Sequence, residues 1–189
     1  QRQMCISDRK RGNANHGWLN ANHSFSFAQY YNPERMNFGA LRVLNDDTIA
    51  PGMGFGIHPH DNMEIVTIPL EGDLEHKDSM GNVGAINEGE IQVMSAGTGI
   101  QHSEYNKNQD KSINLLQLWV MPNALNVSPR YDQKSIRELK KNNAFYQVLS
   151  PFTDDDGMWI HQEAWFHLGE FDKITEIEYQ IKKNGNGIY

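Results

Sequence analysis

The chain has 189 residues, a net charge of −7 and a pI of about 5.6, and 38% of its residues are hydrophobic. This length suits one sizeable core, or one domain and part of another. The acidic balance leaves no broad basic surface for phosphate groups, so direct binding to nucleic acid is disfavoured. No apolar run approaches the roughly 20 residues that a membrane-spanning helix needs, so we expect no membrane insertion.

The number of cysteines and the N-terminal residues indicate the cellular compartment of the protein. Cys5 is the one cysteine of the sequence, which excludes an intramolecular disulfide and a metal site built from thiolates. The first residues hold neither a hydrophobic signal core nor an initiator methionine. We therefore expect a cytoplasmic protein in a reducing compartment, with its first residues trimmed or not recorded.

The first half of the chain alternates short β-branched and aromatic segments with glycine-rich turns, a pattern typical of an all-β sandwich or barrel. Pro69 lies inside an apolar segment and predicts a strand end or bulge, because proline cannot donate to a sheet. Gly81 and Asn82 predict a tight hairpin turn. The expected strands are 38–44, 54–60, 64–70, 74–77, 91–95, 102–105 and 113–120.

The stretch "DQKSIRELKKNN" predicts a helix that connects two β units. Ser135 can cap it, Glu138 follows at the spacing of a capping box, and lysines occupy its last turn. Four strands are expected after it, at 145–151, 158–162, 164–171 and 176–182. A turn at 184–187 would start one more strand at 188–189, so we expect a truncated second unit whose open sheet edge could pair with another copy or a protein partner.

Two histidine pairs carry the clearest chemical signal. His58 and His60 flank one proline, and His102 and Glu104 repeat the same spacing about 40 residues later. Residues i and i+2 of an extended strand point to the same side, so each pair can converge on one object. Glycines precede both pairs and allow the backbone to bend there. Three imidazoles and one carboxylate suit a divalent first-row transition metal.

These residues lie in a longer resemblance. The stretches "HPHDNMEIVTIPLEGDLEHKDSMGN" and "GEIQVMSAGTGIQHSEYN", with "HGWLNANHSFSFAQYYNPERMNFGALRVLNDD" upstream, closely resemble the pirin family of the cupin superfamily, particularly its bacterial pirin-like bicupins. The similarity is dense over residues 9–122. Two departures from the general cupin motifs, a late Gly72 and Gly97 in place of a proline, are ones that pirins share.

The resemblance implies two cupin domains, each a double-stranded β-helix or jelly-roll barrel, with metal in the N-terminal one. We accordingly predict a complete metal-binding cupin at 1–130, a helical connector at 131–143 and the start of a C-terminal cupin at 144–189. The second unit holds no histidine pair, and we expect structural roles for His161 and His167.

The family's ligand pattern selects the metal residues. Many cupins take their carboxylate from the position of Glu64, whereas pirin-like proteins take it from that of Glu104. The spacing of the residues alone is compatible with either glutamate as the ligand. We choose Glu104 because pirin-like proteins use that position. The predicted ligands are His58, His60, His102 and Glu104. Iron(II) is the expected metal, with nickel, copper, manganese, cobalt or zinc as alternatives.

Some pirin-like proteins are quercetin 2,3-dioxygenases, so the resemblance implies a small aromatic or flavonol substrate and O2. His102 and Glu104 are then expected at the reacting centre, and Glu104 or Glu64 as the general base. The pocket candidates are Phe25, Phe27, Phe38 and Phe55. Two alternatives stay open: a metal-containing regulator that binds a protein partner in transcription, and a dioxygenase acting on another enolisable compound.

Overall fold

The computed structural model describes residues 10–172 and 176–189; Cys5, named above, lies outside them. The regular structure of the described chain is almost entirely β, as predicted. Its strands are β1 Gly12–Asn15, β2 Leu19–His23, β3 Leu41–Ile49, β4 Gly54–His60, β5 Glu64–Glu71, β6 Leu74–Asp78, β7 Val83–Ile86, β8 Glu90–Ser95, β9 Ile100–Asn106, β10 Ile113–Val120, β11 Arg130–Ser135, β12 Tyr146–Ser150, β13 Met158–Trp159 and β14 Phe166–Leu168.

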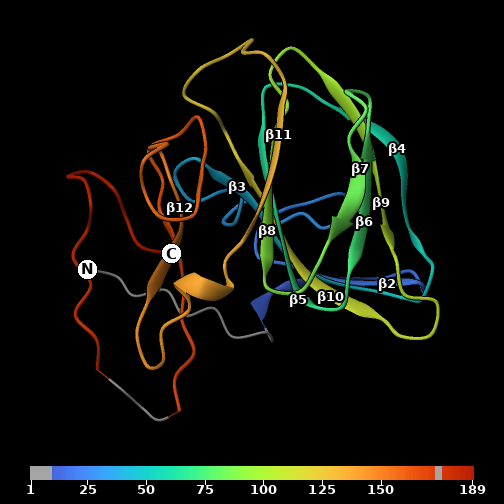
Figure 1. Cartoon of the computed structure of the whole chain (residues 1–189), viewed down its shortest axis with the longest axis horizontal. Coiled ribbons are helices and arrows are strands. Elements are labelled where there is room, and N and C mark those ends of the chain that lie inside the picture. The colour runs from blue at the N-terminus through green and yellow to red at the C-terminus, as the bar shows by residue number, and fades with distance from the viewer. Residues whose placement is uncertain (1–9, 173–175) are drawn as a thin grey trace.

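Within the described residues the strands form three sheets. A seven-stranded sheet has the order β1-β2-β3-β10-β5-β8-β11, and a four-stranded sheet has the order β4-β9-β6-β7. Figure 1 shows the four-stranded sheet facing the larger one, with the small sheet β13-β12-β14 beyond the opposite face of the larger sheet. The central strand β5 is consequently buried on both faces over its first six residues. No described helix is long and apolar enough to cross a membrane.

Alternating side chains of the large sheet serve two cores. Val66 and Ile68 of β5 face the C-terminal part, where they join a cluster that includes Val148 and Leu149 of β12. Ile65 points the other way, into the space between the two larger sheets, and packs with Met94, Ala96 and Ile100. The C-terminal part thus covers one face of the large sheet, and the other face is left for the site.

Two local predictions are confirmed. The pairing of β10 with β5 skips from Glu71 to Pro69, which places a bulge at Leu70. The hairpin between β6 and β7 turns over Gly81, whose φ is 96°. Asp78 holds this turn, because its carboxylate accepts hydrogen bonds from the backbone N–H groups of Met80 and Asn82 at 2.9 and 3.0 Å.

The prediction of a connector helix is wrong. Residues 130–135 form β11, paired in register with β8, and the helical part shrinks to one 3-10 turn at Arg137–Leu139. Gln133 secures the strand by donating to the carbonyl of Ala85 and the carboxylate of Glu90, at 2.8 and 2.7 Å. This strand extends the first sheet into the predicted connector. The division at residues 130 and 143 otherwise stays a prediction.

The strands observed in the second β unit agree in part with the predicted ones. Strands β12, β13 and β14 fall inside three predicted segments, but 176–182 and 188–189 form no strand. The turn near the end is confirmed, since Asn186 donates to the carbonyl of Lys183 at 3.2 Å. The ring of Tyr189 then packs on Phe25 and Phe38, with ring centroids 5.1 and 5.4 Å apart.

The prediction also missed β7 and the two N-terminal strands. β1 and β2 are rich in asparagine, which has low strand propensity, so the sequence pattern missed them. They form because β2 pairs with β3 in continuous register. The strand expected at 38–44 is displaced, since β3 begins at Leu41 and runs to Ile49.

Candidate metal centre

Three histidines meet between β4 and β9. His58 and His102 are paired positions of these strands, and their ring centroids lie 4.3 Å apart. His60 lies 5.0 Å from each of those two rings. One ring nitrogen from each histidine lies within 4.8 Å of the others, a spacing at which one ion can contact all three. The structure thus brings three of the four predicted ligands together, and Glu104 is not part of this group.

Glycine allows β4 to approach β9 this closely. A Cβ atom at Gly54 would lie 2.1 Å from the carbonyl oxygen of Glu104, which no side chain could tolerate. Gly97, in the turn before β9, has a φ of 49°, and a Cβ there would lie 2.0 Å from the carbonyl oxygen of Val127. Both glycines therefore have a steric reason to precede the ligand pairs.

Burial keeps two of these imidazoles, those of His60 and His102, neutral. His102 is 1% exposed, and neither of its ring nitrogens has a hydrogen-bond partner among the described residues. Burial, reinforced by the neighbouring His58, lowers the pKa of His102 to about 2. The same two causes lower the pKa of His60 to about 4. Neutral rings with free lone pairs are what a metal ion requires.

The tautomer of His58 is set by its backbone. Its Nδ1 lies 2.7 Å from the carbonyl oxygen of Gly56, and because a carbonyl only accepts, this nitrogen carries the proton. Nε2 is then the nitrogen with a free lone pair. A backbone carbonyl on the outer nitrogen is the usual way in which a histidine ligand is oriented.

Glu104 lies beside this cluster and is held by two polar side chains. Gln117 donates to one carboxylate oxygen at 3.0 Å and Thr67 to the other at 3.4 Å. The side chain is 2% exposed, and this burial raises the pKa of Glu104 to about 7, although both hydrogen bonds oppose the shift. Glu104 shares a second ligand-like group with His102 and His76, whose donor atoms also lie within 4.8 Å of one another.

His76 is the site residue that the sequence prediction missed. It lies on β6 directly opposite Glu104 and is fully buried. Its Nε2 donates to Asp78 at 3.2 Å, its ring stacks on Tyr131 at 4.6 Å, and its Nδ1 has no described partner. Burial lowers the pKa of His76 and keeps the ring neutral. His76 and Asp78 repeat the i, i+2 spacing, which was the available signal.

Glu64 lies outside the site. Its carboxylate accepts a hydrogen bond from Ser95 at 2.8 Å and faces Arg130 and His161, on the C-terminal side of the large sheet. Between His60 and Glu64 the chain turns through Asn62, whose φ is 43°. A straight strand, which would place Glu64 on the same face as His58 and His60, is therefore absent, and Glu64 is a wrong candidate for the general base.

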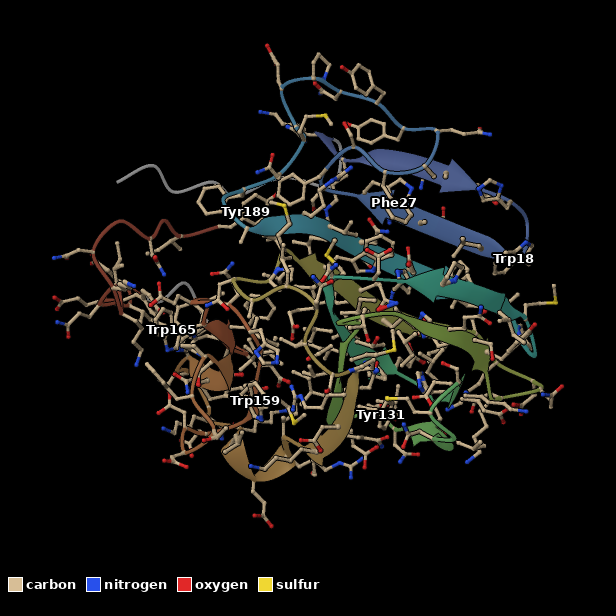
Figure 2. All side chains as sticks on the ribbon, turned by 90° about the horizontal axis from the view of Figure 1, so that it is seen from above. Trp18, Phe27, Tyr131, Trp159, Trp165 and Tyr189 are labelled. Carbon is tan, nitrogen blue, oxygen red and sulfur yellow. The ribbon has the colours of Figure 1, made fainter. Side chains whose placement is uncertain are left out.

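An apolar cavity of about 440 Å³ opens beside His58 and Glu104. Phe27 and Phe55 line it, as predicted, whereas Phe25 and Phe38 are not among its lining residues. Figure 2 shows Trp18 and Phe27 beside the N-terminal strands, which form this end of the fold. The other lining residues are Trp18, Leu19, Ala21, His23, Asn45, Asp47, Gly54, Gly56, Gln117 and Trp119.

A larger cavity, of about 570 Å³, lies on the opposite face of the large sheet. Phe38 and His167 line it, but no residue of either histidine group does. His161 packs edge-on against Trp159, and His167 packs against Tyr179. Both contacts agree with the predicted structural roles of these two histidines.

Comparison with known proteins agrees with the fold. The family model described as Pirin matches residues 6–120, and the model described as quercetinase C-terminal cupin domain matches residues 147–189. A curated relative, quercetin 2,3-dioxygenase of Escherichia coli K12, is 51% identical over 172 residues. That alignment covers 91% of this chain and 73% of the relative.

Two solved structures of Escherichia coli YhhW are similar throughout the matched region. One is 50% identical with a TM-score of 0.78, covering 83% of this chain and 66% of that one. The other, described as a bacterial pirin in complex with nickel(II), is 48% identical with a TM-score of 0.79, covering 85% and 68%. The chain thus spans about two thirds of these solved chains.

Proposed function

Because this chain belongs to the pirin family of cupins, we propose that it is a metal-dependent dioxygenase that acts on quercetin or a related flavonol. The observation that carries the proposal is the cluster of His58, His60 and His102, of which His58 lines an apolar cavity together with Glu104. The neutral imidazoles of His60 and His102 and the free Nε2 of His58 fit a transition metal, and the cavity fits a planar aromatic ligand.

His58, His60, His102 and Glu104 would hold one ion. The donor set favours a first-row transition metal, and iron(II) remains the expected ion, with nickel as the first alternative because a similar pirin was solved with nickel(II). When bound, such an ion supplies a positive charge that stabilises a deprotonated hydroxyl oxygen of the substrate. Gln117 and Thr67 limit the orientations of Glu104 and keep its carboxylate at the cavity wall.

The cavity residues would orient the substrate and exclude water. Trp18 packs edge-on against Phe55, and Phe27 against Trp119, with ring centroids 5.3 and 5.4 Å apart. These pairs give the cavity rigid aromatic walls, on which a flat polyphenol can stack. An open apolar cavity beside the histidines favours an enzyme over a regulator whose surface alone is read by a partner.

Oxygen uptake by the metal-loaded protein with quercetin tests the proposal. Samples loaded with iron(II) and with nickel(II) are compared after elemental analysis has established the metal content. His102→Ala should abolish uptake and metal binding, whereas the control His167→Ala, outside the site, should retain both. No uptake from a fully loaded wild-type protein with either metal would overturn the proposed activity and favour the regulator or another enolisable substrate. The cytoplasmic location and a protein partner or second copy stay predictions.

A further inference from the structure

One acidic side chain in the cavity has no role in the site described so far. Asp47 lies on β3, where alternate residues from Val43 to Ile49 are buried, and it lines the cavity together with His58 and Glu104. It is 4% exposed, and its Oδ1 has no hydrogen-bond partner in the described part of the chain. A buried carboxyl oxygen without a donor is destabilising, so its presence calls for a function.

Apart from the indole of Trp119, most other polar side chains of the cavity wall are already engaged. His23 and Asn45 bond to each other at 2.9 Å, and Gln117 bonds to Glu104. The two oxygens of Glu104 accept from Gln117 and Thr67, and that carboxylate is the proposed metal ligand. Among the carboxyl groups lining the cavity, Asp47 is thus the one with an oxygen left to meet a substrate.

Asp46, the preceding residue, points to the other face of β3, where its carboxylate has partners. Its carboxylate pairs with Arg11 at 3.1 Å and accepts a hydrogen bond from Asn114 at 2.9 Å. Burial, together with the charges of Asp46 and Glu104, raises the pKa of Asp47 to about 7. A carboxyl group with such a pKa can accept and return a proton near neutral pH.

We propose that Asp47 binds a hydroxyl group of the substrate and accepts its proton. This inference rests on the proposed function, since it places the substrate in the same cavity. The O–H bond of the substrate breaks, its electron pair stays on the oxygen, and the proton bonds to a carboxylate oxygen of Asp47. The result is a substrate oxyanion and a neutral Asp47 carboxyl, and the proton can return to product in a later step.

Trp119 narrows the class of substrate further. Its indole lines the same cavity, and its Nε1–H is buried without an acceptor in the described part of the molecule. A ligand that satisfied both Asp47 and Trp119 would carry a hydroxyl donor and an oxygen acceptor on one planar ring system. A hydroxyl next to a ring carbonyl meets both demands, whereas an aromatic hydrocarbon meets neither.

The test compares Asp47→Asn with Asp46→Asn. Both changes replace a carboxylate with an amide on adjacent residues of one strand, but only the first alters the cavity. With quercetin, Asp47→Asn should lower kcat by about 100-fold, the scale of one general base, with KM changed by less than about threefold. Asp46→Asn should behave as the wild type, and all three proteins should carry equal metal.

A second readout does not depend on turnover. Quercetin bound under nitrogen should show the long-wavelength absorption of its anion in the wild type and in Asp46→Asn, and that of the neutral form in Asp47→Asn. If Asp47→Asn loads no metal, Asp47→Ser takes its place. An active wild type with an equally active or equally anion-forming Asp47 variant would overturn this inference and leave the proposed function standing. A wild type that neither binds nor consumes quercetin would overturn both.

Discussion

His76 and Glu104 occupy directly paired positions of β6 and β9, and their side chains are 0% and 2% exposed. Asp78 fixes His76 from the far side, because its carboxylate accepts the Nε2–H of the ring at 3.2 Å. Hydrogen bonds from Asn82 and His76 outweigh burial and hold the pKa of Asp78 below its usual value, so this partner is ionised. Nδ1 of His76 is therefore the nitrogen with a free lone pair, and it has no partner among the described residues. His76 also forms a group of possible metal ligands with His102 and Glu104.

This arrangement predicts that His76 positions the metal ligands. His76→Gln should weaken metal binding by about 10- to 100-fold, the usual effect of removing a group that orients a ligand. Isothermal titration with nickel(II) measures the change. His23→Gln is the matched control, since His23 is also buried and lines the cavity but belongs to neither histidine group. Equal affinities for His76→Gln and the wild type would rule out a positioning role.

The choice of carboxylate ligand is tested by two conservative changes. Glu104→Gln should weaken metal binding strongly, because an amide is a poor replacement for a charged ligand. Glu64→Gln should leave the affinity unchanged within about twofold, since Glu64 faces Ser95 on the other side of β5. The measurement is metal content after dialysis against a weak chelator. The reverse order of effects would show that the ligand assignment is wrong.

The histidine cluster could be predicted because neighbouring residues in the sequence indicate it. His58 and His60 share a face through strand periodicity, and glycines before them mark a close approach of two strands. His76 could not be predicted in the same way. Its place in the site depends on the pairing of β6 with β9, strands about 25 residues apart, and a sequence pattern does not specify which strands pair.

The two wrong predictions have different physical causes. Residues 132–143 resemble a capped helix because their polar residues suit a solvated helix, but the same polarity suits an exposed edge strand such as β11. Glu64 appeared to share a face with His60 only if the strand ran straight. The left-handed backbone at Asn62 interrupts the alternation of side-chain directions, so Glu64 does not share a face with His60. Such a turn at asparagine is hard to foresee from one sequence.

The number of protons released on metal binding should show whether Glu104 is a metal ligand. Its pKa is raised to about 7, so a large share of this carboxyl is protonated at about pH 6 and must lose its proton to bind the ion. Affinity should therefore fall up to about tenfold for each pH unit below 7 through this group alone. Titration calorimetry in buffers of different ionisation enthalpy counts the protons released. Glu104→Gln should release about one proton fewer than the wild type at pH 6; equal counts would contradict the assignment.

Asp47 should make the metal-free protein less stable as the pH rises. Its pKa is raised from 3.8 to about 7 in the folded state, so the fold favours the protonated form. Below about pH 4 the group is protonated in both the folded and unfolded states and has no effect on the free energy of unfolding. Above about pH 7 it is ionised in both, and the folded state is then disfavoured by up to about 4 kcal/mol.

Asp47→Asn removes this ionisation and retains the shape of the side chain. The variant should therefore gain stability over the wild type progressively from about pH 4 to about pH 8, as measured by urea unfolding of the metal-free proteins. Asp46→Asn should show no such gain, because Asp46 is paired with Arg11 and its loss removes a favourable contact. A difference between wild type and Asp47→Asn that is constant over this range would mean that the Asp47 carboxyl titrates normally. It would then be ionised throughout, and the free oxygen in the cavity would be that of a carboxylate with a solvated partner.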